Sequence, residues 1–170
     1  MRWFWVDRFT EFVSGSHAKG LKNVSLAEES VDEYCPGFPY LPPTLIVEGM
    51  AQIGGILVGE HFLFEKRVVL AKVGRAKFHA PARVGDQLTY EVRIDAMQDN
   101  GATVVSTSHC GNDLQAEIDL MFAFLEDGVL IEGPLYAPDD LWSMLHIMNF
   151  FAVAVDAHGN RYPKYEKLLS

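Results

Sequence analysis

The sequence predicts an α+β fold in which a curved antiparallel sheet wraps around one long central helix. Residues from Pro43 to about Phe62 or Phe64 are apolar on nearly every side of a helix, so other elements must surround them. Several later segments alternate apolar and polar residues, which is typical of half-buried strands. A sheet curved around the helix is the simplest arrangement that buries both kinds of element.

The chain begins with a predicted β-hairpin. Its strands, Phe9–Val13 and His17–Val24, flank the turn-forming residues Ser14-Gly15-Ser16. The acidic residues 27–33 come next, and we expect them to be irregular.

Prolines define the start of the central helix. Four of them stand between residues 36 and 43, where each fixes its own backbone and disfavours helix in the residue before it. The last, Pro43, suits the first turn of a helix, where a missing N–H costs little. We therefore expect the helix to begin at Pro43 or Thr44. Its glycines allow a close approach to the sheet or to a second copy: Gly49, Gly54, Gly55 and Gly59.

Three or four antiparallel strands are predicted after the helix. The clearest runs from Leu88 to Ala96 and alternates strictly between apolar and polar residues. Asp99-Asn100-Gly101 then forms a hairpin turn. The other predicted strands are a β-rich stretch over 68–78, a strand that continues through Cys110, and a last alternating strand over 114–124.

Residues 128–170 are predicted to extend a main domain that spans residues 1–127. Asp139 and Asp140 stand where the positive end of a helix dipole favours acids. The apolar residues after them, within the stretch 139–155, predict one helix of about four turns. We expect this helix to pack on the same domain or across a dimer.

Composition excludes several classes of protein. Apolar residues make up 49% of the chain, too many for a disordered one, and a net charge of −9 argues against nucleic acid as a partner. Two cysteines without zinc spacing favour reduced thiols in the cytoplasm and no metal. The apolar run 44–64 contains Glu48, Gln52 and Glu60, which favours a buried helix over a membrane span.

Four short motifs occur in a fixed order. They are Tyr34-Cys35-Pro36-Gly37, Pro42-Pro43, Glu48-Gly49-Met50-Ala51-Gln52, and a segment with Phe78, Pro81, Gly85, Asp86 and Leu88. Together they resemble the (3R)-hydroxyacyl-acyl carrier protein dehydratases of fatty acid synthesis, a family with the hot-dog fold. That family has His-Phe-Pro-Gly, Pro-Gly, a helix carboxylate with Ala-Gln, and Phe-x-x-Pro-x-x-x-Gly-Asp-x-Leu at the four places. The resemblance covers roughly residues 5–126.

The resemblance implies chemistry on a 3-hydroxyacyl thioester between two subunits. In that family a histidine removes the C2 proton, a helix carboxylate protonates the leaving hydroxyl, and a backbone N–H polarises the carbonyl. Glu48 matches the carboxylate, Tyr34 stands at the histidine position, and Pro43 replaces the glycine that donates the N–H. A phenol is a weak base at neutral pH and proline has no N–H, so we predict that ordinary dehydration is weak or absent.

Further binding residues are predicted from the same motifs. We expect the substrate to contact Gly37, Thr44, Gln52, Phe78 and His79. The Thr44 amide lies at the helix N-terminus, where it is a partial substitute for the missing donor. His79 is the histidine that we consider as a substitute base.

A basic segment indicates how the rest of the substrate is bound. Residues 66–83 hold six of the 14 Lys and Arg residues and no acid, a pattern that fits either a solvated strand face or a docking patch for an acidic partner. We predict that Arg75 and Lys77 contact an acidic acyl carrier protein or the phosphates of coenzyme A. The resemblance also implies a homodimer, or a higher oligomer of dimers, and no cofactor.

Two other functions fit the same residues. Hot-dog thioesterases use a helix carboxylate to activate water or attack the thioester, a task that Glu48 can perform without a histidine, with Gln52 one turn along the same face. A non-catalytic acyl-binding or partner subunit would keep the acyl tunnel that the resemblance implies at the subunit interface, and would lack the chemistry.

Overall fold

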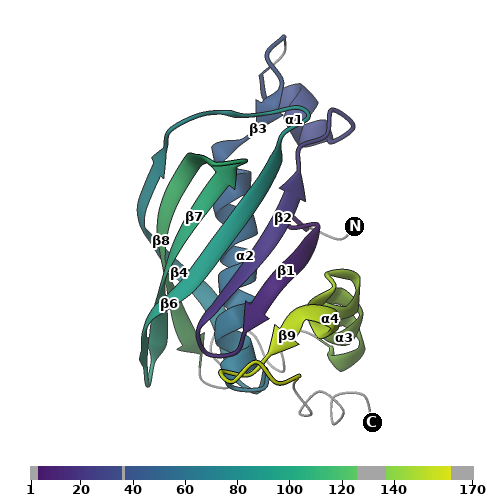
Figure 1. Cartoon of the computed structure of the whole chain (residues 1–170). Coiled ribbons are helices and arrows are strands. Elements are labelled where there is room, and N and C mark those ends of the chain that lie inside the picture. Colours follow the sequence, from purple (N-terminus) through teal and green to yellow (C-terminus); the bar gives the residue numbers. More distant parts are fainter. Residues whose placement is uncertain (1–3, 36, 126–136, 162–170) are drawn as a thin grey trace.

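The computed structural model describes residues 4–35, 37–125 and 137–161 of the chain. Figure 1 shows one long helix enclosed by strands, with smaller elements near its two ends. The helices are Glu29–Tyr34 (α1), Pro43–His61 (α2), Pro138–Ile147 (α3) and Phe150–Val153 (α4). The strands are Arg8–Val13 (β1), His17–Asn23 (β2), Tyr40–Leu41 (β3), Arg67–Phe78 (β4), Ala82–Arg83 (β5), Gln87–Gln98 (β6), Gly101–Cys110 (β7), Asp113–Leu125 (β8) and Ala154–Val155 (β9).

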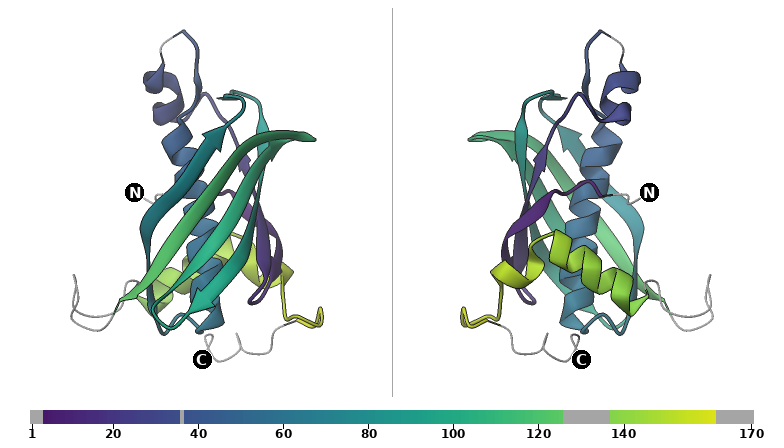
Figure 2. Two further views of the ribbon diagram at one scale, coloured as in Figure 1. Left: turned by 90° about the vertical axis from the view of Figure 1, so that its left-hand side faces the viewer. Right: turned by 90° about the vertical axis from the view of Figure 1, so that its right-hand side faces the viewer.

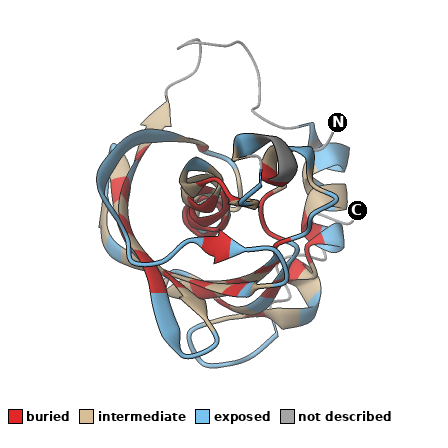
Figure 3. Cartoon of the chain, turned by 90° about the horizontal axis from the view of Figure 1, so that it is seen from above, coloured by how far each residue is buried: buried red, intermediate tan, exposed pale blue. Residues whose placement is uncertain are grey.

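Seven strands form one curved sheet, in the order β4-β8-β7-β6-β2-β1-β9. Neighbouring strands are antiparallel except β9, which is parallel to β1. Figure 3 shows α2 from above, lying on the concave side of this sheet. The predicted α+β fold, with its long helix and its antiparallel strands after the helix, is therefore confirmed.

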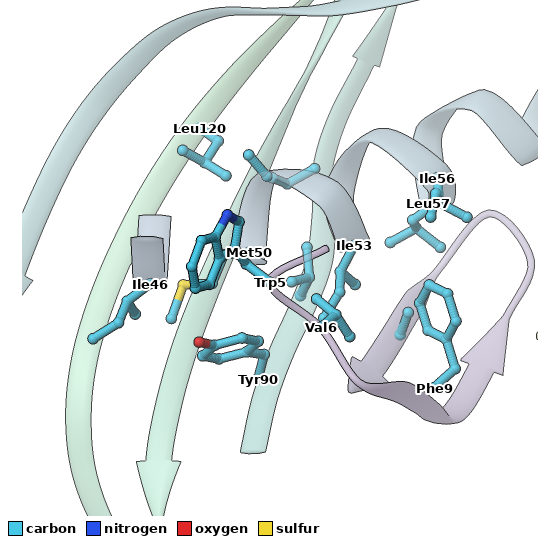
Figure 4. Packing of buried hydrophobic residues seen from close by; sticks show 14 of the residues in the cluster. Trp5, Val6, Phe9, Ile46, Met50, Ile53, Ile56, Leu57, Tyr90 and Leu120 are labelled. Atoms are coloured by element: carbon cyan, nitrogen blue, oxygen red, sulfur yellow. The ribbon is translucent and has the colours of Figure 1, made fainter. Parts of the chain in front are cut away.

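Large apolar side chains fix α2 against the sheet. Four of them on one helix face are almost fully buried: Ile46, Met50, Ile53 and Leu57. Figure 4 shows them in the layer that also holds Tyr90 of β6 and Leu120 of β8. The helix approaches closely here because a Cβ on Gly49 would lie 2.7 Å from the Tyr90 ring. Among the described residues, no helix reaches the length and hydropathy that a membrane span requires.

The segment after the first hairpin differs from the expectation that residues 27–33 are irregular. Glu29–Tyr34 form the short helix α1, which ends just before the proline-rich stretch. Val31 of this helix is fully buried, and the buried Lys22 ammonium donates a hydrogen bond to the Glu28 carboxylate. These tertiary contacts stabilise a turn of helix that local periodicity does not indicate.

The prediction of a single C-terminal helix of about four turns is wrong, because two shorter helices, α3 and α4, occupy this stretch. Asn149 has a left-handed backbone with φ of 61°, and it separates α3 from α4. The chain then continues as β9, which pairs with β1 and extends the sheet by one strand. The predicted domain boundary between residues 127 and 128 falls within 126–136, outside the described residues.

Candidate functional site

Glu48 and Gln52 lie one turn apart on α2 and contact each other. Nε2 of Gln52 donates a hydrogen bond to Oε1 of Glu48 at 3.1 Å. Oε1 of Gln52 accepts a hydrogen bond from the backbone N–H of Trp5 at 2.9 Å. Since Trp5 is itself buried, it holds the Gln52 amide, which in turn orients the Glu48 carboxylate.

A cavity of about 550 Å³ adjoins this pair, a size typical of small-molecule sites. Its walls come from α2, the start of β4, Phe122 of β8, the N-terminal Phe4 and the region of α3. The α2 wall is a single stripe made of Glu48, Ala51, Gln52, Gly55, Ile56 and Gly59. The polar Glu48 and Gln52 lie toward the N-terminal end of α2, and the rest of this stripe is apolar.

Two adjacent glycines of α2 lie on different faces of the helix. Gly55 lines the cavity, and a Cβ there would have only a Phe122 ring atom at 3.7 Å, an ordinary contact distance. Gly54 faces the sheet instead, where a Cβ would lie 3.0 Å from the Phe122 ring. The helix therefore has a tightly packed sheet face and a more open cavity face.

Tyr34 and Gly37 lie apart from the cavity. Tyr34 ends α1, is 52% exposed, and stacks edge-on against Tyr40 with ring centroids 5.3 Å apart. Gly37 follows in an exposed turn with φ of 84°. Neither belongs to the described residues that line the cavity. Within one chain, Tyr34 is thus not brought together with Glu48.

Pro43 and Thr44 form the first turn of α2, as the sequence predicts. Pro43 is the first helical residue, and Thr44 is exposed beside it. Thr44 does not line the cavity, although it stands one turn before Glu48 on the same helix.

The residues predicted near the end of β4 form a separate cluster. Nε2 of His79 lies 2.9 Å from Oε2 of Glu117, and Nη2 of Arg75 lies 3.4 Å from the same oxygen. The hydrogen bond with His79 holds the pKa of Glu117 below its usual value, and the charges of Arg75 and Lys77 add to this. Phe78 is 36% exposed at the same end of the strand. In this chain His79 therefore contacts Glu117 and not the Glu48 cavity.

The basic segment 66–83 is divided between two environments. Arg67 is buried and lines the cavity, where Lys66 also contributes. Nζ of Lys66 lies 4.2 Å from the Phe62 ring centroid. Lys72, Arg75 and Lys77 are exposed on β4. The contact of Arg75 and Lys77 with a carrier protein or with coenzyme A stays a prediction.

Leu141, Met144 and Met148 are cavity residues that sequence reasoning missed. They belong to α3 and the residue that follows it, and their apolar spacing indicates a helix without indicating which element the helix covers. The described residues hold no cluster of three or more His, Cys, Asp or Glu side chains that could bind a metal ion.

Sequence comparison relates the chain to one family of acyl-chain enzymes. The sequence model of the FabA-like domain matches residues 3–116. The 3-hydroxyacyl-[acyl-carrier-protein] dehydratase FabZ of Pelotomaculum thermopropionicum is 37% identical over 119 residues, which cover 69% of this chain and 85% of the relative. The FabZ dehydratase of a Thermoanaerobacter species is 34% identical over 124 residues, covering 72% and 87%.

Solved hot-dog structures share the fold at low sequence identity. The dehydratase heterocomplex ApeI:P from Xenorhabdus doucetiae aligns with a TM-score of 0.61 at 13% identity, covering 83% of this chain and 88% of that one. Smu.793 from Streptococcus mutans, bound to acetyl CoA, aligns with a TM-score of 0.60 at 17% identity, covering 74% and 93%. A hypothetical thioesterase from Streptococcus pneumoniae with coenzyme A gives 0.58 at 10% identity, covering 69% and 84%.

Proposed function

Because this chain belongs to the FabA-like family of hot-dog fold proteins, we propose that it acts on acyl thioesters of an acyl carrier protein or of coenzyme A, in fatty acid or related acyl-chain metabolism. The observation that carries the proposal is the cavity beside Glu48, where a carboxylate oriented by Gln52 adjoins walls that are mostly apolar. The acyl chain occupies the apolar part. The thioester carbonyl then lies beside a group that can give or take a proton.

Ordinary 3-hydroxyacyl dehydration is weak or absent in this proposal. Tyr34 places a phenol where the family has an imidazole base, and Pro43 has no N–H to donate. A positioned general base contributes about 10²–10⁴-fold, and one oxyanion donor about 10²–10³-fold. Losing both removes most of the rate enhancement that such a site provides.

Restoring the two groups tests this part of the proposal. We expect wild-type protein to form no enoyl product from 3-hydroxyacyl thioesters at enzymatic rates. The double variant Tyr34→His, Pro43→Gly should gain dehydration by at least about 10²-fold. Adding Glu48→Gln to the double variant should remove that gain. Wild-type turnover of roughly 1 s⁻¹ or faster, the ordinary range of enzymes, would contradict the proposal.

Thioester hydrolysis is the second candidate, and the Glu48–Gln52 pair favours it because the reaction needs no histidine. Glu48 takes a proton from a water molecule whose oxygen attacks the thioester carbonyl carbon. The C–S bond then breaks as the carbonyl re-forms. The thiolate leaves with the proton that Glu48 returns, and the products are a carboxylic acid and a free thiol.

Release of free thiol distinguishes hydrolysis from binding alone. If hydrolysis occurs, acyl-CoA should give thiol with the wild type and about 10²–10⁴-fold more slowly with Glu48→Gln. No thiol release at any chain length would exclude hydrolysis. Acyl-thioester binding without product in either assay would identify a non-catalytic acyl-binding or partner subunit.

A second copy of the chain is part of the proposal, and β4 supports it. This strand is at one edge of the sheet, and residues 70–80 are all exposed. It presents large apolar side chains to solvent, namely Leu70, Val73 and Phe78. The unpaired backbone N–H and C=O groups on the outer side of an edge strand are a template for pairing with another chain. If two copies pair along β4, the neighbouring subunit can supply its Tyr34 and Gly37 to the Glu48 cavity.

We place this activity in the cytoplasm. Cys35 and Cys110, the two cysteines of the chain, are both free thiols, as expected in a reducing compartment. Cell fractionation tests the location, and recovery in a secreted or membrane fraction would contradict it.

A further inference from the structure

We propose that α3 forms the outer wall of the cavity beside Glu48. In this position it limits the length of the acyl chain that the protein binds. The inference rests on the proposed function, since it concerns the acyl chain that we propose the Glu48 cavity binds. Figure 2 shows α3 crossing the C-terminal half of α2 on the side that the sheet leaves open. Leu141 and Met144 of α3, and Met148 after it, line the cavity from this side.

The cavity extends far enough along α2 to hold a linear acyl chain. Its α2 wall runs from Glu48 to Gly59, a distance of about 16 Å at the rise of an α-helix. Glu48 and Gln52 lie at the beginning of this wall, and Gly55, Ile56 and Gly59 continue it as an apolar surface. A thioester at Glu48 therefore directs its acyl chain along α2, into the space that α3 covers.

The position of α3 is fixed by contacts at its C-terminal end. The backbone N–H of Phe9 donates to the carbonyl oxygen of Met148 at 2.8 Å. Phe150 is fully buried between Phe9 and Phe12, with ring centroids 6.0 and 4.7 Å away. The strand pairing of β9 with β1 continues this attachment. Because α3 is held in place, it sets a definite limit on the length of the bound acyl chain.

Methionine side chains suit a wall that touches acyl chains. They are unbranched, polarizable and able to adopt several rotamers, so they adjust to apolar ligands of irregular outline. Met144 is half-buried on α3, so its side chain is the easiest part of the wall to change without altering the core. Because α3 begins at residue 138, this wall lies outside residues 3–116, which match the FabA-like domain.

Equilibrium binding of straight-chain acyl-CoAs, from acetyl to palmitoyl, tests the wall directly. Each methylene that enters the cavity should raise the affinity of the wild type by about fourfold, until the chain reaches α3. Met144→Ala should move this limit to longer chains and strengthen binding of the longest acyl-CoA by about tenfold. Met144→Trp should weaken binding of the best wild-type ligand by about tenfold and leave acetyl-CoA binding unchanged.

Met121→Ala is the matched control, because Met121 is 41% exposed on β8 and belongs to another surface. Its chain-length profile should equal that of the wild type. Gly55→Ala narrows the cavity from the opposite wall, and it should shorten the preferred chain as Met144→Trp does. Circular dichroism and thermal unfolding establish that each variant is folded.

The outcomes separate the inference from the proposed function. Loss of affinity by the same factor at every chain length in the Met144 variants would overturn the inference, because α3 would then support the fold without limiting the ligand. Profiles identical to wild type in both Met144 variants would overturn it as well. In either case chain-length-dependent binding by the wild type keeps the proposed function. A wild type that binds no acyl-CoA of any length overturns both.

Discussion

At the scale of single residues, the orientation of the Glu48 carboxylate depends on two consecutive hydrogen bonds that begin at Trp5, near the N-terminus. The Trp5 N–H fixes the Gln52 amide, and Gln52 donates to Glu48. Glutamine is suited to this position because one side chain both accepts from a backbone N–H and donates to a carboxylate. The orientation of the candidate site is thus set by a residue 47 positions away in sequence.

Gln52→Leu should lower the free energy of unfolding by roughly 1–3 kcal/mol, because the Trp5 N–H and Glu48 both lose this half-buried partner. Urea denaturation measures the change. Gln98→Leu, at an exposed position at the end of β6, is the control and should stay within about 0.5 kcal/mol of wild type. Equal changes in the free energy of unfolding in the two variants would show that the hydrogen bonds of Gln52 contribute nothing to stability.

Tyr90 gives a second prediction, one that depends on pH. Burial raises the pKa of the Tyr90 hydroxyl, and the carboxylates of Asp7 and Glu28 raise it further. The hydroxyl has no hydrogen-bond partner among the described residues. The folded protein therefore keeps a proton that the unfolded chain releases above about pH 10, so this residue makes stability fall as pH rises through that range.

Tyr90→Phe removes both effects. At neutral pH it should raise the free energy of unfolding by roughly 1 kcal/mol, since a buried polar group without a partner is lost. Above about pH 10 its advantage over wild type should grow, because phenylalanine has no proton to lose. Denaturation at the two pH values measures both. If the difference in free energy of unfolding between variant and wild type stays constant or decreases as pH rises, this prediction is contradicted.

At the scale of elements, α2 has two faces with different tolerance for side chains. A Cβ on Gly49 would lie 2.6 Å from the carbonyl oxygen of Trp5 and 2.7 Å from the Tyr90 ring. A Cβ on Gly55 would meet ordinary contacts beside the cavity. One glycine is required by packing, whereas the other leaves space for a ligand.

Substituting alanine at the two glycines distinguishes these roles. Gly49→Ala should destabilise the protein by roughly 1–3 kcal/mol, because the overlap outweighs the gain in helix propensity. Gly55→Ala should be neutral or stabilising by up to about 1 kcal/mol. Thermal unfolding measures both. A Gly55→Ala variant as unstable as Gly49→Ala would mean that the helix is packed tightly on both faces.

The elements themselves follow from the sequence where the signal is local. Strict alternation in residues 88–96 predicts β6, and Pro43 before an apolar run predicts the start of α2. The Glu48–Gln52 pair follows from i,i+4 spacing alone. In each case the cause of the structure lies within a few residues of its effect.

The remaining features depend on distant contacts. Asn149 ends α3 through a left-handed backbone, and asparagine is one of few residues that tolerate it, yet nothing nearby indicates that this one adopts it. The pairing of β9 with β1 joins residues more than 140 positions apart. The pairing of β9 with β1 helps to hold α3, and with it Met144, against the cavity. The local sequence therefore indicates that α3 is a helix but not which element it packs against.

At the scale of the whole molecule, one edge of the sheet is covered and the other is open. The short β9 occupies the edge beside β1, whereas β4 is open along its outer side. In β4 the residues from Leu70 to Phe78 are exposed. This asymmetry makes β4 the surface on which the proposed second copy pairs.

Val73→Glu should dissociate the proposed dimer, because it places a charge among the apolar side chains of the β4 edge, where Val73 is 41% exposed. The matched control is Val105→Glu on β7, a central strand where valine is 42% exposed. Sedimentation velocity should give a monomer for the first and a dimer for the second. A wild type that sediments as a monomer, or two variants that behave alike, would contradict pairing along β4.

The central claim is that an acyl chain lies between α2 and α3 with its thioester at Glu48. Photo-crosslinking tests it most directly, using wild-type protein and an acyl-CoA that carries a diazirine at the end of its chain. Mass spectrometry should find the label on cavity residues of α2 from Ala51 to Gly59 or on α3 near Met144, and excess unlabelled acyl-CoA should remove it. Label confined to the outer face of the sheet, or label that does not compete, would contradict the claim.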